Sequence, residues 1–208
     1  MKSAAASTQN NMLSVYASPL IGAYFGVIAF ALGAVMGSFL NCAAWRTAHG
    51  ESFLSGRSHC TSCGHELNAR DLVPIFSWLF SKGRCRWCGE RVSARYPLTE
   101  LFFALLTLSC LFRFDLTVLC LRNFCFLCIL FYISLVDAEA KIIPDTALII
   151  AAAVWLLSLP FLWSGWQDFL LRLLAAVIFG GGTLLISIIL DKKLGRESLG
   201  GGDIKLFA

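Results

Sequence analysis

Charged residues are scarce in this chain of 208 residues. Asp, Glu, Lys and Arg together make up 14% of the sequence, whereas hydrophobic residues make up 58%. Because ordinary soluble domains are about one quarter charged, this composition excludes an ordinary soluble protein and predicts one that uses a membrane as its solvent. Within the apolar segments, only Arg122 and Arg172 come near the middle. Transporters bind their substrates with polar groups at mid-membrane, so this scarcity also argues against a transporter.

The hydrophobic residues gather into five blocks, and a sixth begins near Asp203. A helix of about 20 apolar residues crosses about 30 Å of hydrocarbon, and the first block is too long for the core of a signal peptide. The sequence therefore predicts an all-α, polytopic transmembrane helix bundle of about five helices plus the start of a sixth. Its three parts are an N-terminal segment with the first helix, a polar loop, and a helical core: residues 1–45, 46–97 and 98–208. The five blocks are residues 19–45, 98–112, 116–136, 146–163 and 169–190.

Basic residues predict the orientation in the membrane. Lys and Arg favour the cytoplasmic side of short loops, so the polar loop should be cytoplasmic. Alternating the helices from there puts residues 137–145 and 191–202 on the same side and the N-terminus on the other. The membrane topology alone explains why this loop is rich in basic residues, so nucleic-acid binding is not needed to account for them. We therefore expect membrane lipid, and no nucleic acid, as a partner. The loop holds eight of the seventeen Lys and Arg residues: Arg46, Arg57, Arg70, Lys82, Arg84, Arg86, Arg91 and Arg95.

Four of the nine cysteines form two C-x2-C pairs in the polar loop, Cys60 with Cys63 and Cys85 with Cys88. Each pair directs two thiolates to one ion, and a glycine follows each pair, where a tight turn is needed. Four thiolates complete a tetrahedral shell and leave no position for a water molecule. The sequence therefore predicts a structural Zn²⁺ in a small zinc-binding loop domain rather than a catalytic metal.

Other interpretations of these cysteines stay open at this point. They could be redox dithiols or plain free thiols, and His59 or His65 could replace a cysteine as a ligand. Basic neighbours, Arg57, Arg84 and Arg86, are expected to favour the thiolates. The remaining cysteines lie in predicted helices, where a thiol behaves as a small hydrophobic group, so we expect core packing. They are Cys42, Cys110, Cys120, Cys125 and Cys128.

Two aspartates are predicted at the cytoplasmic ends of helices. Asp137 follows an apolar run, and Asp203 follows three consecutive glycines that let another segment approach closely. Carboxylates at a bilayer boundary are costly unless they are used. If the two lie close together, they share one proton and can activate a water molecule, as in an aspartic protease. Solvated loop residues are the alternative, while Asp145 is expected to cap the next helix.

Several further motifs complete the pattern around these residues. They are Gly37-Ser-Phe-Leu-Asn41, Asp71-Leu-Val-Pro-Ile-Phe-Ser-Trp78, Arg95-Tyr-Pro97 with Glu100, Ile143-Pro-Asp145, and Gly200-Gly-Gly-Asp203 with Lys205 and Leu206. In this order, together with the two cysteine pairs, they make the chain resemble the prepilin peptidase family. Its members are membrane aspartic peptidases of the bacterial inner membrane that process type IV prepilins and type II secretion pseudopilins.

The resemblance implies that Asp137 and Asp203 are the catalytic pair. Glu139 stands where the family often carries a second aspartate, which favours Asp137. Members with the cysteine loop commonly also methylate the new amino terminus with S-adenosylmethionine, so the resemblance implies that activity as well. Members continue through further helices after the glycine–aspartate motif, so we expect the peptidase core to be incomplete at residue 208.

A non-enzymatic function is the competing hypothesis. The chain would then be a membrane assembly or scaffold protein whose zinc loop binds a partner and whose aspartates are merely solvated. Only a peptidase needs both Asp137 and Asp203, so replacing both distinguishes the two hypotheses.

Overall fold

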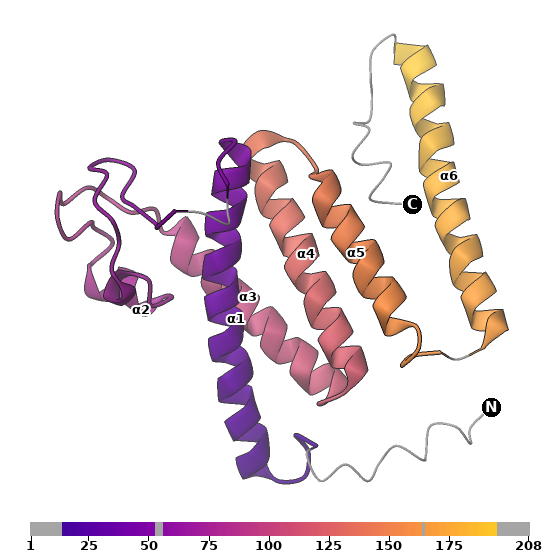
Figure 1. Ribbon diagram of the computed structural model, residues 1–208, viewed down its shortest axis with the longest axis horizontal. Helices are drawn as coiled ribbons and strands as arrows, with labels where there is room; N and C mark the ends of the chain where they lie inside the picture. The colour runs from indigo at the N-terminus through magenta and orange to yellow at the C-terminus, as the bar shows by residue number, and fades with distance from the viewer. Residues whose placement is uncertain (1–13, 53–55, 164, 195–208) are drawn as a thin grey trace. The chain divides into compact units, whose positions relative to one another are not determined.

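The computed structural model describes residues 14–52, 56–163 and 165–194, and all of its regular elements in these ranges are helical (Figure 1). The chain divides into two compact units, Met1–Leu135 and Val136–Ala208, which are described separately. The predicted all-α class is therefore confirmed for the described residues. The elements are α1 (Pro19–Ala48), η1 (Ala69–Asp71), α2 (Phe76–Phe80), α3 (Arg95–Phe114), α4 (Val118–Ala140), α5 (Asp145–Ser158) and α6 (Trp166–Leu194).

Among the described residues, three helices are long and apolar enough to cross a membrane: α1, α3 and α4. Helix α5 is apolar but has only 14 residues, about 21 Å of helix, which is shorter than the predicted block. The structure thus supports a membrane protein with at least these three spans in its described part. The predicted total of about five helices and a sixth stays a prediction.

Helix α1 begins at a well-defined cap. The Ser18 hydroxyl accepts a hydrogen bond from the Ile21 N–H at 3.2 Å, and Pro19 occupies the first helical position, where its missing N–H costs nothing. The helix runs for 30 residues, somewhat longer than the predicted 19–45. Its buried face is made largely of small residues at helical spacing: Gly22, Gly26, Ala29, Gly33 and Gly37.

These small residues let α1 pack closely against α3. A Cβ atom built at Gly33 would lie 2.7 Å from the Cα of Ala104 and 2.7 Å from the Thr107 hydroxyl, so only glycine fits at this crossing. About two turns later, the Asn41 amide donates to the Thr99 hydroxyl at 2.6 Å and to the Gly37 carbonyl at 3.1 Å. Close packing of small residues and interhelical hydrogen bonds are the interactions that hold helices together in lipid.

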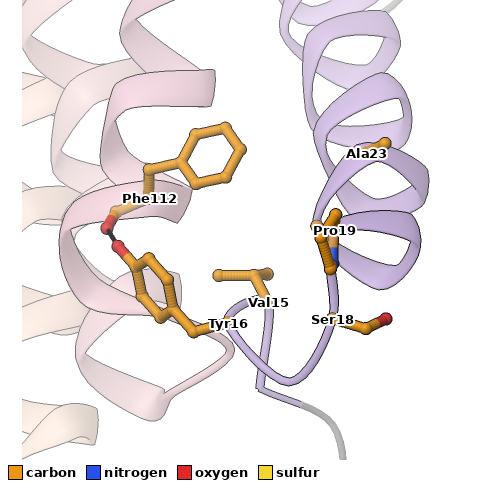
Figure 2. A pocket seen from close by; sticks show the side chains of 7 residues that line it. Val15, Tyr16, Ser18, Pro19, Ala23 and Phe112 are labelled. Atoms are coloured by element: carbon orange, nitrogen blue, oxygen red, sulfur yellow. Dashed lines mark hydrogen bonds between the residues drawn. The ribbon is translucent and has the colours of Figure 1, made fainter.

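The segment before α1 is tied to the turn after α3. Asp115 accepts hydrogen bonds from the Ser14 hydroxyl at 2.5 Å and from the Val15 N–H at 2.9 Å, while the Tyr16 hydroxyl donates to the Phe112 carbonyl. Burial acts to raise the pKa of Asp115, but the hydrogen bonds from Ser14, Val15 and Leu116 outweigh it and lower the pKa. Residues of this segment, of the start of α1 and of α3 line an open hollow of about 360 Å³. Figure 2 shows side chains that line it, among them Val15, Tyr16 and Phe112.

Aromatic and thiol contacts join α3 to α4. Phe103 is fully buried, and its ring centroid lies 4.7 Å from that of Phe131. Near the turn between the helices, the Sγ atoms of Cys110 and Cys120 lie 4.0 Å apart. Cys110 is buried, as expected for a cysteine that packs in the core.

In the second unit, aromatic rings gather where α5 leads into α6. Trp155 stacks on Phe169 with centroids 6.1 Å apart, and Trp163 lies edge-on to Trp166 at 5.2 Å. Tryptophan clusters of this kind are typical of the membrane–water interface, which agrees with the predicted turn at this position.

Candidate metal centre and catalytic carboxylates

The two C-x2-C pairs adopt the same local structure. In the first, the Gly64 N–H donates to the Cys60 carbonyl at 2.8 Å; in the second, the Gly89 N–H donates to the Cys85 carbonyl at 3.0 Å. Both glycines have positive φ angles, 69° and 73°, which other residues rarely adopt. The predicted role of a glycine after each pair is therefore confirmed at both positions.

All four thiols of the pairs converge. The Sγ atoms of Cys60, Cys63, Cys85 and Cys88 all lie within 4.8 Å of one another, and those of Cys60 and Cys88 are 3.9 Å apart. Zn–S bonds of about 2.3 Å in a tetrahedron place sulfurs about 3.8 Å apart, so the cluster fits a Zn²⁺ ion with little adjustment. The structure thus brings the predicted ligand set together, from segments that are 21 residues apart.

The backbone and the neighbouring thiols decide the charge of this cluster. Backbone N–H groups of Cys63 and Ser62 donate to Cys60 and lower its pKa to about 6. The N–H of Glu90 acts on Cys88 in the same direction, but desolvation and the three other thiols raise the pKa of Cys88 to about 12. Cys60 thus ionises more easily than Cys88, and a divalent cation bound at the cluster would favour the thiolate form of its ligands.

Side chains around the cluster hold the two knuckles together. The rings of His65 and Trp87 stack with centroids 3.8 Å apart, which joins the first knuckle to the second. The Nδ1 atom of His59 lies 3.4 Å from the Arg57 carbonyl. Neither histidine belongs to the group of possible ligands found among the described residues, so the alternative in which a histidine replaces a cysteine is not supported.

Two of the arginines near the knuckles have carboxylate partners. Arg57 pairs with Glu66 at 3.0 Å, and Arg86 pairs with Asp71 at 3.2 Å. The expected support of the thiolates by the arginines stays a prediction. Backbone N–H groups lower the pKa of Cys60, a local effect that the side-chain sequence does not reveal.

Asp137 lies in the last turn of α4, not in the loop where the sequence placed it. The helix continues to Ala140 because Asp-Ala-Glu-Ala contains good helix formers, and it ends where Lys141 adopts a φ of 57°. The side chains of Asp137 and Glu139 are both exposed. Asp145 is the first residue of α5, after Pro144, rather than the residue before the helix.

The second predicted catalytic residue, Asp203, lies outside the described residues, and the catalytic pair stays a prediction. The S-adenosylmethionine site carries no residue assignment in the part of the chain that is described.

Glu100 has a role that the sequence did not indicate beyond its place in a motif. Although it lies in a candidate span, α3, it is only 8% exposed, and its carboxylate accepts a hydrogen bond from the Ile75 N–H at 2.7 Å. The signal was a carboxylate in a predicted membrane helix, which is costly unless it has a partner. It thus connects the polar loop to the membrane-spanning part.

Comparisons with known proteins agree with these observations. Residues 31–114 match the model of the bacterial peptidase A24 N-terminal domain, and residues 124–208 match the model of the type IV leader peptidase family. No solved structure matches the chain.

Three curated relatives carry the name prepilin leader peptidase/N-methyltransferase. The protein of Myxococcus xanthus is 34% identical over 90% of this chain and 55% of the relative. The protein of Dichelobacter nodosus is 31% identical over 92% of this chain and 70% of the relative, and that of Bacillus subtilis is 32% identical over 87% and 70%. The chain thus spans between 55% and 70% of the length of these relatives. By both family models and by this level of identity, the chain belongs to the type IV leader peptidase family.

Proposed function

We propose that this protein is a prepilin peptidase of the bacterial inner membrane. It cleaves the basic leader of type IV prepilins or type II secretion pseudopilins where the leader meets the apolar helix, at the cytoplasmic boundary. The observation that carries this proposal is the match of two successive family models, which together cover most of the chain. The exposed carboxylate of Asp137 at the end of an apolar helix supports it, because such a group is placed to act at the boundary.

The proposed chemistry uses Asp137 and Asp203 as a pair that shares one proton. The ionised carboxylate takes a proton from a water molecule, whose oxygen attacks the scissile carbonyl carbon. The protonated carboxyl donates its hydrogen to the carbonyl oxygen, and the tetrahedral intermediate then breaks its C–N bond as the amine gains a proton. Both aspartates, like the zinc loop, are proposed to face the cytoplasm, where a prepilin leader is found.

The metal is proposed to be structural. Cys60, Cys63, Cys85 and Cys88 would hold Zn²⁺ through all four of its tetrahedral positions, so no position is left for water or substrate. The ion would stabilise the loop of residues 46–97 by offsetting part of the negative charge of four thiolates that lie within 4.8 Å of one another. No catalytic step passes through it.

N-methylation of the new amino terminus is the second proposed activity. It rests on the names of the relatives, which include N-methyltransferase. S-adenosylmethionine would supply the methyl group when bound. None of the described side chains is assigned to it.

Leader cleavage in membranes tests the peptidase. The full reading frame that contains this chain is expressed with a prepilin, and the leader-cleaved product is measured by gel mobility and mass spectrometry. We expect Asp137→Asn to abolish the product, while Glu139→Gln and Asp145→Asn, at matched protein levels, retain much of it. No cleavage by the wild type, or equal cleavage by all variants, would contradict the proposal. Such a result would instead fit a scaffold protein whose aspartates are merely solvated.

A further inference from the structure

The short helix α2 carries an apolar stripe on its outer side. Phe76, Leu79 and Phe80, at helical spacing, are 54%, 54% and 78% exposed. Leu72 and Val73, just before the helix, are also exposed, at 44% and 45%. Five large apolar side chains in a stretch of nine residues are unusual on a loop that faces water, and such patches mark an interaction surface.

The other side of α2 is fixed to the second zinc knuckle. The Trp78 indole N–H donates to the Val92 carbonyl at 2.9 Å, and its ring packs so closely on Gly83 that a Cβ there would lie 2.8 Å from the ring. The stripe is therefore held on the outside of a rigid element, and it cannot turn inward without breaking these contacts.

The residue before α2 contacts one end of a candidate span. The Ile75 N–H, directly before α2, donates to Glu100, which is the sixth residue of α3. At 1.5 Å per residue, Glu100 lies about 8 Å from the start of this 20-residue helix, whose length of about 30 Å would match the hydrocarbon thickness. Helices in the membrane interface bury their apolar face about 5–10 Å into the boundary, and a stripe held beside this end of α3 would lie at that depth.

The backbone at this point is strained, which indicates a maintained position. Ile75 is β-branched and has a φ of 65°, and the Phe76 N–H closes a tight turn onto the Pro74 carbonyl at 2.6 Å. Such a conformation persists only where surrounding contacts enforce it. The hydrogen bond to Glu100 is one such contact.

We propose that α2 and the residues before it form a lipid-binding stripe that inserts into the cytoplasmic leaflet. Phe76, Leu79 and Phe80 would contact phospholipid acyl chains. Lys82 and Arg84, exposed directly after the helix, would reach the lipid phosphates from above, as long basic side chains do at interfaces. The zinc loop is thereby held against the bilayer, where the proposed cleavage takes place, rather than free in the cytoplasm.

Phospholipid fits the stripe better than the two other occupants of an apolar surface, a prepilin helix or a second copy of this chain. The residue before the stripe contacts the second turn of the candidate span α3, and the basic residues Lys82 and Arg84 would complement anionic headgroups at the edge of the stripe. A protein partner requires neither feature.

Site-specific photo-cross-linking tests the inference. p-Benzoyl-phenylalanine replaces Phe80 in the full reading frame, in bacterial membranes, and the adducts formed on irradiation are identified by mass spectrometry. The same replacement at Phe102, which is 56% exposed on α3, is the reference for a lipid-facing position, and zinc content verifies the fold of each variant. We expect phospholipid adducts at Phe80, at a yield comparable to that at Phe102.

The charge contribution is measured in nanodiscs. Purified protein in mixed phosphatidylcholine and phosphatidylglycerol should give adducts at Phe80 enriched in phosphatidylglycerol, and Lys82→Gln with Arg84→Gln should abolish that enrichment. Lipid adducts at Phe102 but none at Phe80 would overturn the proposal, as would adducts at Phe80 that consist of a prepilin or a second copy of the chain. Since this readout requires no proteolysis, its failure is distinguishable from failure of the proposed peptidase activity.

Discussion

The close approach of α1 and α3 at Gly33 leads to a quantitative prediction about stability. In Gly33→Ala, the new Cβ would lie 2.7 Å from the Cα of Ala104 and 2.8 Å from the Cβ of Thr107, so α1 and α3 must separate. Overpacking of this kind costs about 1–3 kcal/mol. Alanine recovers about 1 kcal/mol of helix propensity relative to glycine. The net expectation is a loss of roughly 0–2 kcal/mol.

Gly26 on the same helix is the matched control. A Cβ there would meet only Phe112 and Leu108 side chains, at 3.5 Å or more, which is ordinary contact. Gly26→Ala should therefore keep the propensity gain and be as stable as the wild type or more so. Because the residue change and the helix are the same, the difference between the two variants isolates the steric cost, about 1–3 kcal/mol.

Reversible unfolding in mixed detergent micelles, followed by tryptophan fluorescence, measures both free energies. The six tryptophans of the chain provide the signal. If Gly33→Ala proves as stable as Gly26→Ala, the close approach of α1 and α3 at this crossing is refuted.

Three further predictions follow from individual contacts. Purified protein should contain about one Zn²⁺ per chain, and Cys60→Ser with Cys85→Ser should lose it in elemental analysis; unchanged zinc would contradict the assignment. Because its hydrogen bonds lower the pKa of Asp115, its stabilisation is present above the ordinary value of 3.8 and is lost as the pH falls through the lowered value. The stability difference between wild type and Asp115→Asn should therefore shrink in acid, and a constant difference would contradict this. Glu100→Ala should speed hydrogen exchange at the Ile75 amide and leave exchange at the Phe131 amide unchanged. If the Ile75 amide exchanges at the same rate in the variant and the wild type, the hydrogen bond from Ile75 to Glu100 is ruled out.

Local patterns in the sequence predicted the zinc cluster well. Each knuckle is built from two cysteines and a glycine within five residues, so spacing alone determines most of its geometry. That the two knuckles meet is also predictable, because two C-x2-C pairs supply one complete tetrahedral shell for a Zn²⁺ ion. The stacking of His65 on Trp87 joins the two knuckles. It could not be predicted, because it depends on how segments far apart in the sequence pack together.

Long-range contacts account for what the sequence missed. The small-residue stripe of α1 is visible at Gly22, Gly26, Gly33 and Gly37, but nothing in the pattern says that α3 is its partner.

Boundaries of helices were predicted less accurately than their existence. Helix α4 extends four residues beyond the predicted end at Val136, because the charged residues Asp137 and Glu139 were taken as loop signals although alanines separate them. Helix propensity prevails at this exposed end, since no packing opposes it. As a result, Asp137 projects from a helix, which would give its proposed catalytic role a more rigid support than a loop.

Leader cleavage by single and double aspartate variants tests the central claim most directly. Rates are measured for Asp137→Asn, Asp203→Asn and the variant with both changes, in the full reading frame and at matched protein levels. If the two carboxylates share one proton and act as a unit, each single change should reduce the rate nearly as much as both together. A single variant that cleaves at close to the wild-type rate, or a double variant whose loss equals the product of the two single losses, would contradict the paired-aspartate mechanism.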